Sequence, residues 1–340
     1  MTTNPKKLRV AVIGCGRIAV KHLSSIKKSS YAVLVACCDL RADRAKACAE
    51  EYGAAAYTDF REMLDREKPD AVHICLPHYL HTAVACEAFE RGIHVLCEKP
   101  MDVDFQTARR ATEIAEEKGI LYGIVFQCRY NETSKFIYET VRSGRLGKIL
   151  SVSSVLTWAR DDDYYTSSDW KGTWDKEGGG VIIDQAIHSI DLVNWIVDSE
   201  VTDISAMVAT QGHRSIQVED TACGLITYAN GVKYGFYCMN NFCCNEPIEI
   251  KFICEKGKAI LSYDFAEVLY EDGTGKKLDL TAQMDRSLGD KSYWGKSHTV
   301  QIDQFYRAVL GLEPLQISAR EALKTHSIIC QIYEKAGIKK

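Results

Sequence analysis

The stretch LRVAVIGCGRIA at residues 8–19 constrains the fold more than any other part of this sequence. An apolar run leads into the pattern GxGxxA, which opens a helix. Gly14 allows a tight turn, Gly16 lets the backbone approach a ligand, and Ala19 is small enough for close helix–strand packing. The helix N-terminus then faces an anion. The pattern therefore predicts a dinucleotide site contacted by Gly14, Cys15, Gly16, Arg17 and Ile18.

Asp39 ends the second apolar run, twenty positions after Ala19. A carboxylate at this place accepts hydrogen bonds from ribose hydroxyls and repels a 2′-phosphate, so it favours NAD over NADP. Arg41 and Arg44 follow and would tolerate a 2′-phosphate, so NADP remains the alternative. A plain strand–turn–helix corner, with Asp39 as a helix cap, is the other interpretation of these residues.

The length of 340 residues suits two domains, and the content of 46% hydrophobic and 26% charged residues is typical of a globular protein. The net charge of −4 argues against nucleic acid as a partner. We find no signal peptide and no apolar run of the roughly 18 residues needed to span a membrane. The 14 cysteines include no CxxC pair, so we expect neither disulfides nor a metal site, and a reducing cytoplasm.

The first 127 residues alternate apolar runs with helical patterns, as in a parallel α/β sheet. The expected strands are LRVAVIG, VLVACCD, DAVHICLP, HVLCEKP and LYGIVFQ. Gly53, Gly92 and Gly119 mark helix ends, and Asp59 and Asp102 mark helix starts. Residues 1–127 are thus predicted to form a Rossmann domain.

Residues 128–340 have a different rhythm, with strand patterns that follow one another without helices between them. The expected strands are ILSVSSVLTWA, VTDISAMVATQ, ACGLITYA, VKYGFYCMN, IEIKFICE and KAILSYDF, and EDGTGKK signals a further hairpin. This order predicts an α+β domain with a large, mainly antiparallel open sheet. Closing helices are expected near residues 298–338.

A helical pattern follows the glycines of GGGVIIDQAIHSIDLVNW at residues 178–195. Asp184, His188, Asp191 and Trp195 share one side of a helix with about 3.6 residues per turn, and apolar residues share the other. The glycines are expected to leave room for substrate or nicotinamide. A simple solvated helix face remains the alternative for the polar stripe.

Lys99 and this stripe supply the groups that oxidation of a secondary alcohol needs. Histidine has an unperturbed pKa of about 6.5, so His188 can accept the hydroxyl proton near neutral pH. Asp184, one helical turn earlier, can orient the imidazole. Lys99 follows a strand at the carboxyl edge of the sheet and can stabilise a developing alkoxide. Asp191 receives no assigned role.

Four segments together carry a family resemblance: AVIGCGRIA, PHYLH, CEKP and GGGVIIDQAIH. Their order and spacing resemble those of the Gfo/Idh/MocA oxidoreductases over essentially the whole chain. The resemblance implies a Rossmann domain, a C-terminal domain with a large open sheet, and nicotinamide and substrate bound between them. It also implies a homo-oligomer, a dimer or tetramer, formed through that sheet.

The resemblance implies roles for single residues as well. Lys99 would bind the reacting oxygen, His188 would be the acid/base with Asp184 beside it, and Glu98 would touch the nicotinamide or its ribose. His78 departs from the family, which usually has Asn in its PNxxH motif. The predicted cofactor set further includes Leu76, Pro77, His78, His81, Glu98, Lys99, Gln127, Trp170 and Lys171.

The segment YYTSSDWKGTW at residues 164–174 mixes aromatic rings and hydroxyls, which suits a carbohydrate. An ordinary ordered loop is the alternative. The predicted substrate set is Lys99, Arg129, Tyr130, Lys171, Trp174, Asp184 and His188. Residues 161–163, three adjacent aspartates, are expected to form a solvated acidic turn rather than a metal site.

These observations predict an NAD-dependent dehydrogenase that acts on a secondary hydroxyl of a sugar, glycoside, nucleotide sugar or polyol, with the pyranose 3-position as one candidate. Two alternatives stay open. The first is an enzyme that recycles tightly bound NAD, for glycoside cleavage through a 3-keto intermediate or for sugar–sugar oxidoreduction. The second is a non-catalytic NAD-binding sensor.

Overall fold

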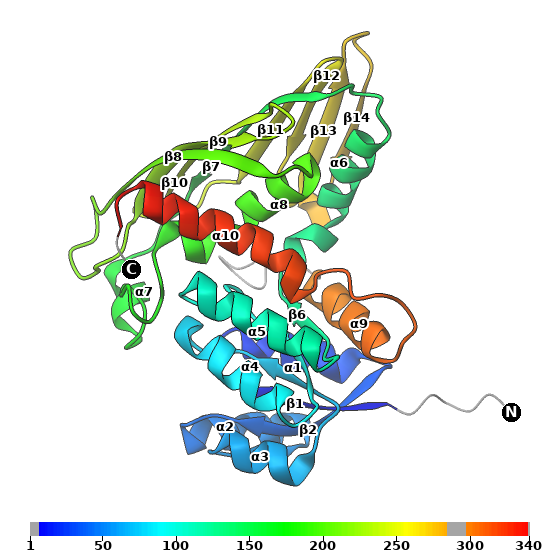
Figure 1. The fold of residues 1–340 in the computed structure, drawn as a ribbon, viewed down its shortest axis with the longest axis vertical. Coiled ribbons are helices and arrows are strands. Elements are labelled where there is room, and N and C mark those ends of the chain that lie inside the picture. Colours follow the sequence, from blue (N-terminus) through cyan, green and yellow to red (C-terminus); the bar gives the residue numbers. More distant parts are fainter. Residues whose placement is uncertain (1–6, 284–296, 339–340) are drawn as a thin grey trace, which may run out of the picture. The chain divides into compact units, whose positions relative to one another are not determined.

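The computed structural model describes residues 7–283 and 297–338, which form two compact units (Figure 1). The first unit lies within residues 1–125 and 298–324, and the second within 126–297 and 325–340. The predicted domain boundary lies at residue 127, with the whole tail in the second domain. In the structure, helix α9 (Ser297–Val309) contributes Ile302, Phe305 and Tyr306 to the core of the first unit.

The first unit contains a six-stranded parallel sheet with the order β3-β2-β1-β4-β5-β6. The strand order switches between β1 and β4: from β1 the chain adds β2 and β3 on one side, and then β4, β5 and β6 on the other. Doubly wound sheets bind ligands at such a switch point. The bounds are β1 (Leu8–Ile13), β2 (Ala32–Cys38), β3 (Ala55–Tyr57), β4 (Ala71–Ile74), β5 (His94–Cys97) and β6 (Tyr122–Ile124). Strand β3 is not among the predicted strands, because this edge strand has three residues and no apolar run of its own.

The helices of this unit largely begin and end where glycine and aspartate predict. Gly53 ends α2 in the left-handed conformation with φ of 72°, and the Asp59 carboxylate accepts hydrogen bonds from two backbone N–H groups of α3. Helix α5 is capped by Asp104 rather than Asp102. Asp102 instead accepts from the backbone N–H groups of Val103 and Asp104, in the turn before this helix. The bounds are α1 (Ala19–Lys28), α2 (Ala42–Tyr52), α3 (Phe60–Glu67), α4 (His81–Phe89) and α5 (Phe105–Glu117).

The second unit contains an eight-stranded sheet with the order β14-β13-β12-β11-β7-β10-β9-β8. One pair, β7 and β10, is parallel and the others are antiparallel, so the predicted mainly antiparallel sheet is confirmed. The bounds are β7 (Ile149–Thr157), β8 (Val201–Ala209), β9 (Thr221–Tyr228), β10 (Lys233–Met239), β11 (Glu249–Cys254), β12 (Gly257–Leu261), β13 (Phe265–Tyr270) and β14 (Gly275–Asp279).

The segment KAILSYDF is not the single strand that its sequence predicts. The chain turns after Leu261, and the Ser262 N–H donates to the Phe265 carbonyl at 2.7 Å. Strand β13 then begins at Phe265 and returns antiparallel to β12. The hairpin predicted at EDGTGKK is present, because it joins β13 to β14.

One face of this sheet is covered and the other is open. Helices α6 (Glu132–Arg142) and α8 (Ile187–Val197) cover one face of the sheet (Figure 1). Along β10, Tyr234, Phe236 and Cys238 are buried on that face, whereas Tyr237 on the opposite face is exposed. This alternation of buried and more exposed residues is typical of a sheet with one covered face. The last helix, α10 (Ala319–Lys335), begins in the first unit and ends in the second.

Among the described residues, none of the fourteen cysteines forms a disulfide, and eight of them are buried. No helix in the described ranges is both long and apolar enough to cross a membrane. Within the same ranges, no group of three or more His, Cys, Asp or Glu side chains is arranged to hold a metal ion.

Candidate functional site

The two glycines of the GxGxxA turn have different structural causes. Gly14 has φ of 93°, and a Cβ built there would lie 2.3 Å from the carbonyl oxygen of Cys75, so only glycine fits. A Cβ at Gly16 would meet nothing within 4 Å. Protein packing therefore does not require Gly16. Its missing side chain leaves open space beside the turn, which fits a pyrophosphate that approaches the backbone.

The start of α1 also fits a phosphate group. Its N-terminus has neither a side-chain cap nor an acidic residue in its first turn, whereas α3 and α5 are capped by aspartates. The carboxylate of Asp39 braces the turn in front of this helix. Its Oδ2 accepts from the Cys15 N–H and its Oδ1 from the Arg41 N–H, both at 2.9 Å. An ionised carboxylate offers about four acceptor positions, so ribose hydroxyls can still bind.

His81 braces the loop that carries Leu76, Pro77 and His78 at the carboxyl end of β4. Its ring is fully buried, with Nδ1 2.7 Å from the Pro100 carbonyl oxygen and Nε2 2.8 Å from that of Leu76. Burial lowers the pKa of His81. A neutral ring has one N–H, so it donates to one of these carbonyls at a time.

Glu98 and Lys99 follow β5 at the same edge of the sheet. Glu98 is buried, and Lys99 is partly exposed. Burial by itself would raise the pKa of Glu98, but the hydrogen bond from His22 and the positive potential of nearby basic groups, Lys99 among them, lower this pKa to about 2. The carboxylate is therefore ionised at neutral pH despite its burial.

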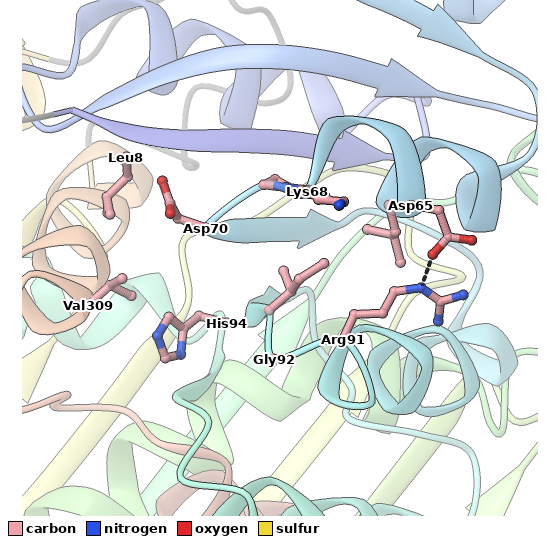
Figure 2. Close-up of a pocket in the computed structure, with 11 residues that line it drawn as sticks. Leu8, Asp65, Lys68, Asp70, Arg91, Gly92, His94 and Val309 are labelled. Carbon is pink, nitrogen blue, oxygen red and sulfur yellow. Dashed lines mark hydrogen bonds and ion pairs between the residues drawn. The ribbon is translucent and has the colours of Figure 1, made fainter.

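A cavity of about 540 Å³ lies at the opposite edge of this sheet, where β1, β4 and β5 begin. Figure 2 shows its charged lining, including the ion pair of Arg91 with Asp65. Lys68, Asp70 and His94 also line it. None of the predicted site residues lies in this cavity. Because ligands of doubly wound sheets bind beyond the carboxyl ends of the strands, we do not assign the cofactor to it.

In the second unit, the glycine run opens a single π-helical turn, Ile182–Ala186, which continues as α8. The buried carboxylate of Glu219 caps this turn by accepting from the Gly180 N–H at 2.9 Å and the Ile182 N–H at 3.0 Å. A Cβ at Gly180 would lie 1.9 Å from the Glu219 carbonyl oxygen, and one at Gly179 would lie 2.0 Å from the Tyr333 hydroxyl. The room at these two glycines is thus taken by Glu219 and Tyr333, and not, as predicted, by a ligand.

The carboxylate of Asp184 is the centre of a polar cluster, of which only Asp184 and Lys171 are predicted site residues. Its Oδ2 accepts from the Tyr164 hydroxyl at 2.6 Å, the Gln185 amide at 2.7 Å and Lys171 Nζ at 3.1 Å. The Lys171 ammonium also lies 2.7 Å from the Tyr164 oxygen and 3.3 Å from Glu177 Oε1. We call Tyr164, Lys171, Glu177 and Asp184 the Asp184 cluster. Three donors from separate segments therefore fix the orientation of this carboxylate.

Charge in the cluster is balanced around Lys171. Burial would lower the pKa of Lys171, but Asp184, Tyr164 and Glu177 raise it well above its usual value. Burial raises the pKa of Glu177 to about 7, with Lys171 opposing and Asp184 adding to the shift. The ammonium is therefore permanent, and Glu177 is the member that changes protonation near neutral pH.

His188 lies near the start of α8 and is partly exposed, as is Asp184. Its ring stands edge-on to Phe126 with centroids 6.0 Å apart. The π turn is wider than an α turn, so the two residues do not have ordinary i, i+4 geometry. π turns of this kind occur often at functional sites.

Asp191 and Trp195, the other members of the polar stripe, pack within the unit. Asp191 is 1% exposed, and its two oxygens accept from Nε and a terminal nitrogen of Arg129, both at 2.7 Å. The Thr325 hydroxyl donates to Asp191 as well, at 2.8 Å. Trp195 stacks on Tyr138 with centroids 4.1 Å apart. These contacts tie Arg129, a predicted substrate residue, to the helix.

The remaining predicted residues of the second unit lie in two segments, residues 164–174 and the 3-10 helical turn Gln127–Tyr130. The Trp174 indole N–H donates to the Gln217 carbonyl at 2.9 Å, and its ring stands edge-on to Tyr333. Trp170 lies 4.6 Å from Lys171 Nζ. Gln127 and Tyr130 are each 6% exposed. Tyr164 had been noted only as part of a sugar-like segment, and nothing in the sequence pointed to Glu177 or Gln185.

The comparisons with known proteins agree with this architecture. Residues 8–126 match the oxidoreductase family with an NAD-binding Rossmann fold, and residues 135–260 match the GFO/IDH/MocA C-terminal domain. D-glucoside 3-dehydrogenase of Escherichia coli is 30% identical, with 99% of this chain and 97% of that protein aligned. An inositol 2-dehydrogenase of Corynebacterium glutamicum is 25% identical over 79% of this chain and 77% of its own.

Solved structures are similar over the whole length. The WlbA dehydrogenase of Bordetella pertussis, in complex with NADH and UDP-GlcNAcA, superposes with a TM-score of 0.85 and 26% identity, covering 98% of this chain and 97% of that one. The chain belongs to the Gfo/Idh/MocA oxidoreductases. It is an NAD-dependent oxidoreductase with an N-terminal Rossmann domain.

Proposed function

We propose that this protein is a dehydrogenase that oxidises a secondary hydroxyl of a pyranoside at the 3-position, with NAD as the acceptor. The alignment with a D-glucoside 3-dehydrogenase over 99% of the chain carries this proposal. The aromatic and hydroxyl-bearing segment at residues 164–174 supports it, because such side chains suit the flat faces and polar edges of a sugar ring.

His188 is proposed as the acid/base and Lys99 as the group that binds the reacting oxygen. The imidazole takes the hydroxyl proton, and the ammonium stabilises the negative charge that develops on the oxygen. Asp184 is proposed to hold a neighbouring substrate hydroxyl, because its carboxylate is already oriented by Tyr164 and Lys171. Bound NAD supplies the hydride acceptor, which no side chain can provide.

The proposed cofactor residues are those of the GxGxxA turn with Asp39, Glu98 and Lys99. Open space at Gly16, the uncapped start of α1 and the ordered carboxylate of Asp39 support this assignment. We propose NAD rather than NADP because Asp39 repels a 2′-phosphate.

The test is turnover of a methyl glucoside, myo-inositol and a UDP-sugar, measured by NADH absorbance and by product analysis. We expect a 3-keto product and stoichiometric NADH. His188→Asn should lower kcat by a factor on the order of 10² to 10⁴ without changing NAD affinity. His94→Asn, in the cavity at the other edge of the sheet, is the matched control. Sugar conversion with no net NADH would instead identify an enzyme that recycles its cofactor, and binding without turnover would identify a sensor.

We also propose a homo-oligomer formed through the open face of the second unit's sheet. Large apolar side chains are exposed there on several strands, which is unusual for a monomer surface. They are Val155, Met207, Leu225, Tyr237, Ile253 and Leu269.

A further inference from the structure

A line of buried polar side chains runs through the first unit and ends at Glu98. The Tyr306 hydroxyl lies 2.8 Å from His73 Nε2, His73 Nδ1 lies 2.7 Å from His22 Nδ1, and His22 Nε2 lies 2.9 Å from Glu98 Oε1. The two histidines and Tyr306 have no exposed surface, and Glu98 is 5% exposed. The four come from α9, β4, α1 and the end of β5, so the line crosses the unit.

The direction of these hydrogen bonds follows from what each atom can do. An ionised carboxylate only accepts, so His22 Nε2 must carry a proton and donate to Glu98. If His22 is neutral, its Nδ1 is then an acceptor, and His73 Nδ1 must donate to it. His73 Nε2 is left as an acceptor for the Tyr306 hydroxyl. Each of the three bonds thus has one donor and one acceptor, all pointing toward Glu98.

The opposite arrangement is possible only if His22 carries a second proton. His73 would then accept at Nδ1 and donate from Nε2, and the Tyr306 oxygen would become an acceptor. Among the described residues, His73 provides the hydrogen bond of the buried Tyr306 hydroxyl. In this opposite arrangement, the hydroxyl proton of Tyr306 would therefore lose its acceptor. An unsatisfied buried donor costs roughly 1–3 kcal/mol. Burial also lowers the pKa of His73 well below its usual value, in agreement with a neutral ring.

We propose that Tyr306, His73 and His22 form a one-directional relay that holds Glu98 ionised and oriented directly before Lys99. The relay is closed at Tyr306, which is buried, so it does not carry a proton to solvent. Its members are positioning residues rather than acids or bases. Their importance for catalysis rests on the proposed function, in which Glu98 and Lys99 act on cofactor and substrate.

The relay also links two parts of the proposed cofactor site. His22 lies one turn into α1, the helix that starts at the GxGxxA turn, and Glu98 ends β5. An ionised carboxylate at the cofactor attracts oxidised nicotinamide, which is a cation, more than the neutral reduced form. The relay is therefore expected to favour NAD⁺ over NADH.

The first experiment needs no cofactor. Ring ¹⁵N shifts of the histidine-labelled, ligand-free protein at neutral pH should show the Nε2–H tautomer for His22 and the Nδ1–H tautomer for His73. In Tyr306→Phe, His73 should no longer favour the Nδ1–H tautomer. Tyr122 is a buried tyrosine of β6, and Tyr122→Phe should leave this preference unchanged. An Nε2–H tautomer for His73 in the wild type would overturn the relay, whether or not the protein proves to be a dehydrogenase.

The second experiment measures binding of NAD⁺ and NADH to the same protein by calorimetry. His22→Leu removes the donor to Glu98 and should lower affinity for NAD⁺ relative to NADH on the order of tenfold. His22→Gln keeps an N–H donor and should restore most of this ratio. An unchanged ratio in His22→Leu would refute the positioning role. If the wild type binds neither form, the proposed function fails. The tautomers of His22 and His73 then test by themselves whether the relay exists.

Discussion

At the scale of single residues, Glu177 is the group whose protonation is most open to experiment. Its pKa is raised from 4.5 to about 7, chiefly by burial. The folded state therefore binds this proton more tightly than the unfolded state does. Stability from this group is fully present below about pH 4.5 and is lost as the pH rises through 7.

Glu177→Gln cannot ionise, so it should remove this pH dependence. Between pH 5 and pH 8, the wild type should lose up to about 3 kcal/mol more unfolding free energy than the variant does. Urea unfolding at several pH values measures the difference. Parallel stability curves for the two proteins would contradict a raised pKa at Glu177. Glu67, an acid of the first unit paired with Arg9, provides a control as Glu67→Gln.

Tyr164 and Tyr165 are adjacent, but only one of them bonds to Asp184. The Tyr164 hydroxyl donates to Asp184, whereas the Tyr165 hydroxyl accepts from the Asn240 amide at 2.7 Å. Tyr164→Phe should lower kcat/KM for the sugar about tenfold, because Asp184 loses one of its donors. Tyr165→Phe should affect stability more than turnover. Steady-state kinetics with both variants decide between this view and a purely structural role for the loop.

At the scale of elements, two glycine-opened helices differ in what their glycines do. A Cβ at Gly180 would collide with the backbone of Glu219, and a Cβ at Gly16 would meet open space. Gly180→Ala should therefore destabilise the protein by several kcal/mol, since backbone atoms must move. Gly16→Ala should leave the melting temperature nearly unchanged and weaken NAD binding. Thermal unfolding and cofactor titration of both variants test the pair, and a stable Gly180→Ala protein would count against the fitted packing.

The elements also show what a sequence can and cannot predict. The GxGxxA turn, the capping by Asp59 and strand β10 depend on neighbours in the chain, and local patterns found them. The cap of the π turn depends on Glu219, which lies 39 positions beyond Gly180. No local pattern signals such a partner. The π turn likewise breaks the 3.6-residue period on which the stripe was predicted.

The candidate site follows the same division. Lys99, Asp184 and His188 could be predicted because they stand in recognisable motifs, and their roles stay predictions. Lys171 and Asp184 were both predicted as substrate residues, but their cluster with Tyr164 and Glu177 was not, because these side chains converge only when an irregular loop folds back on the helix. Arg129, predicted to face a substrate, is bonded to Asp191, 62 positions away, and no local pattern signalled this partner. Buried ion pairs of this kind are set by tertiary packing.

At the scale of the whole molecule, the open sheet face bears on assembly. Strand register aligns Met207, Cys223, Tyr237 and Val155 in one row across β8, β9, β10 and β7. All four are exposed, and Met207 is 73% exposed. Such an apolar row is costly to leave in water and is typical of an interface.

Met207→Lys with Tyr237→Lys places two charges in this row and should dissociate the oligomer to monomers. Burying unpaired ammonium groups in an interface costs several kcal/mol each, more than most interfaces of this type can supply. Light scattering at micromolar concentration measures the mass. Leu312→Lys is the matched control, because Leu312 is 64% exposed but belongs to the first unit. A wild type that is already monomeric, or a double variant that keeps the oligomeric mass, would show that the sheet face serves another purpose.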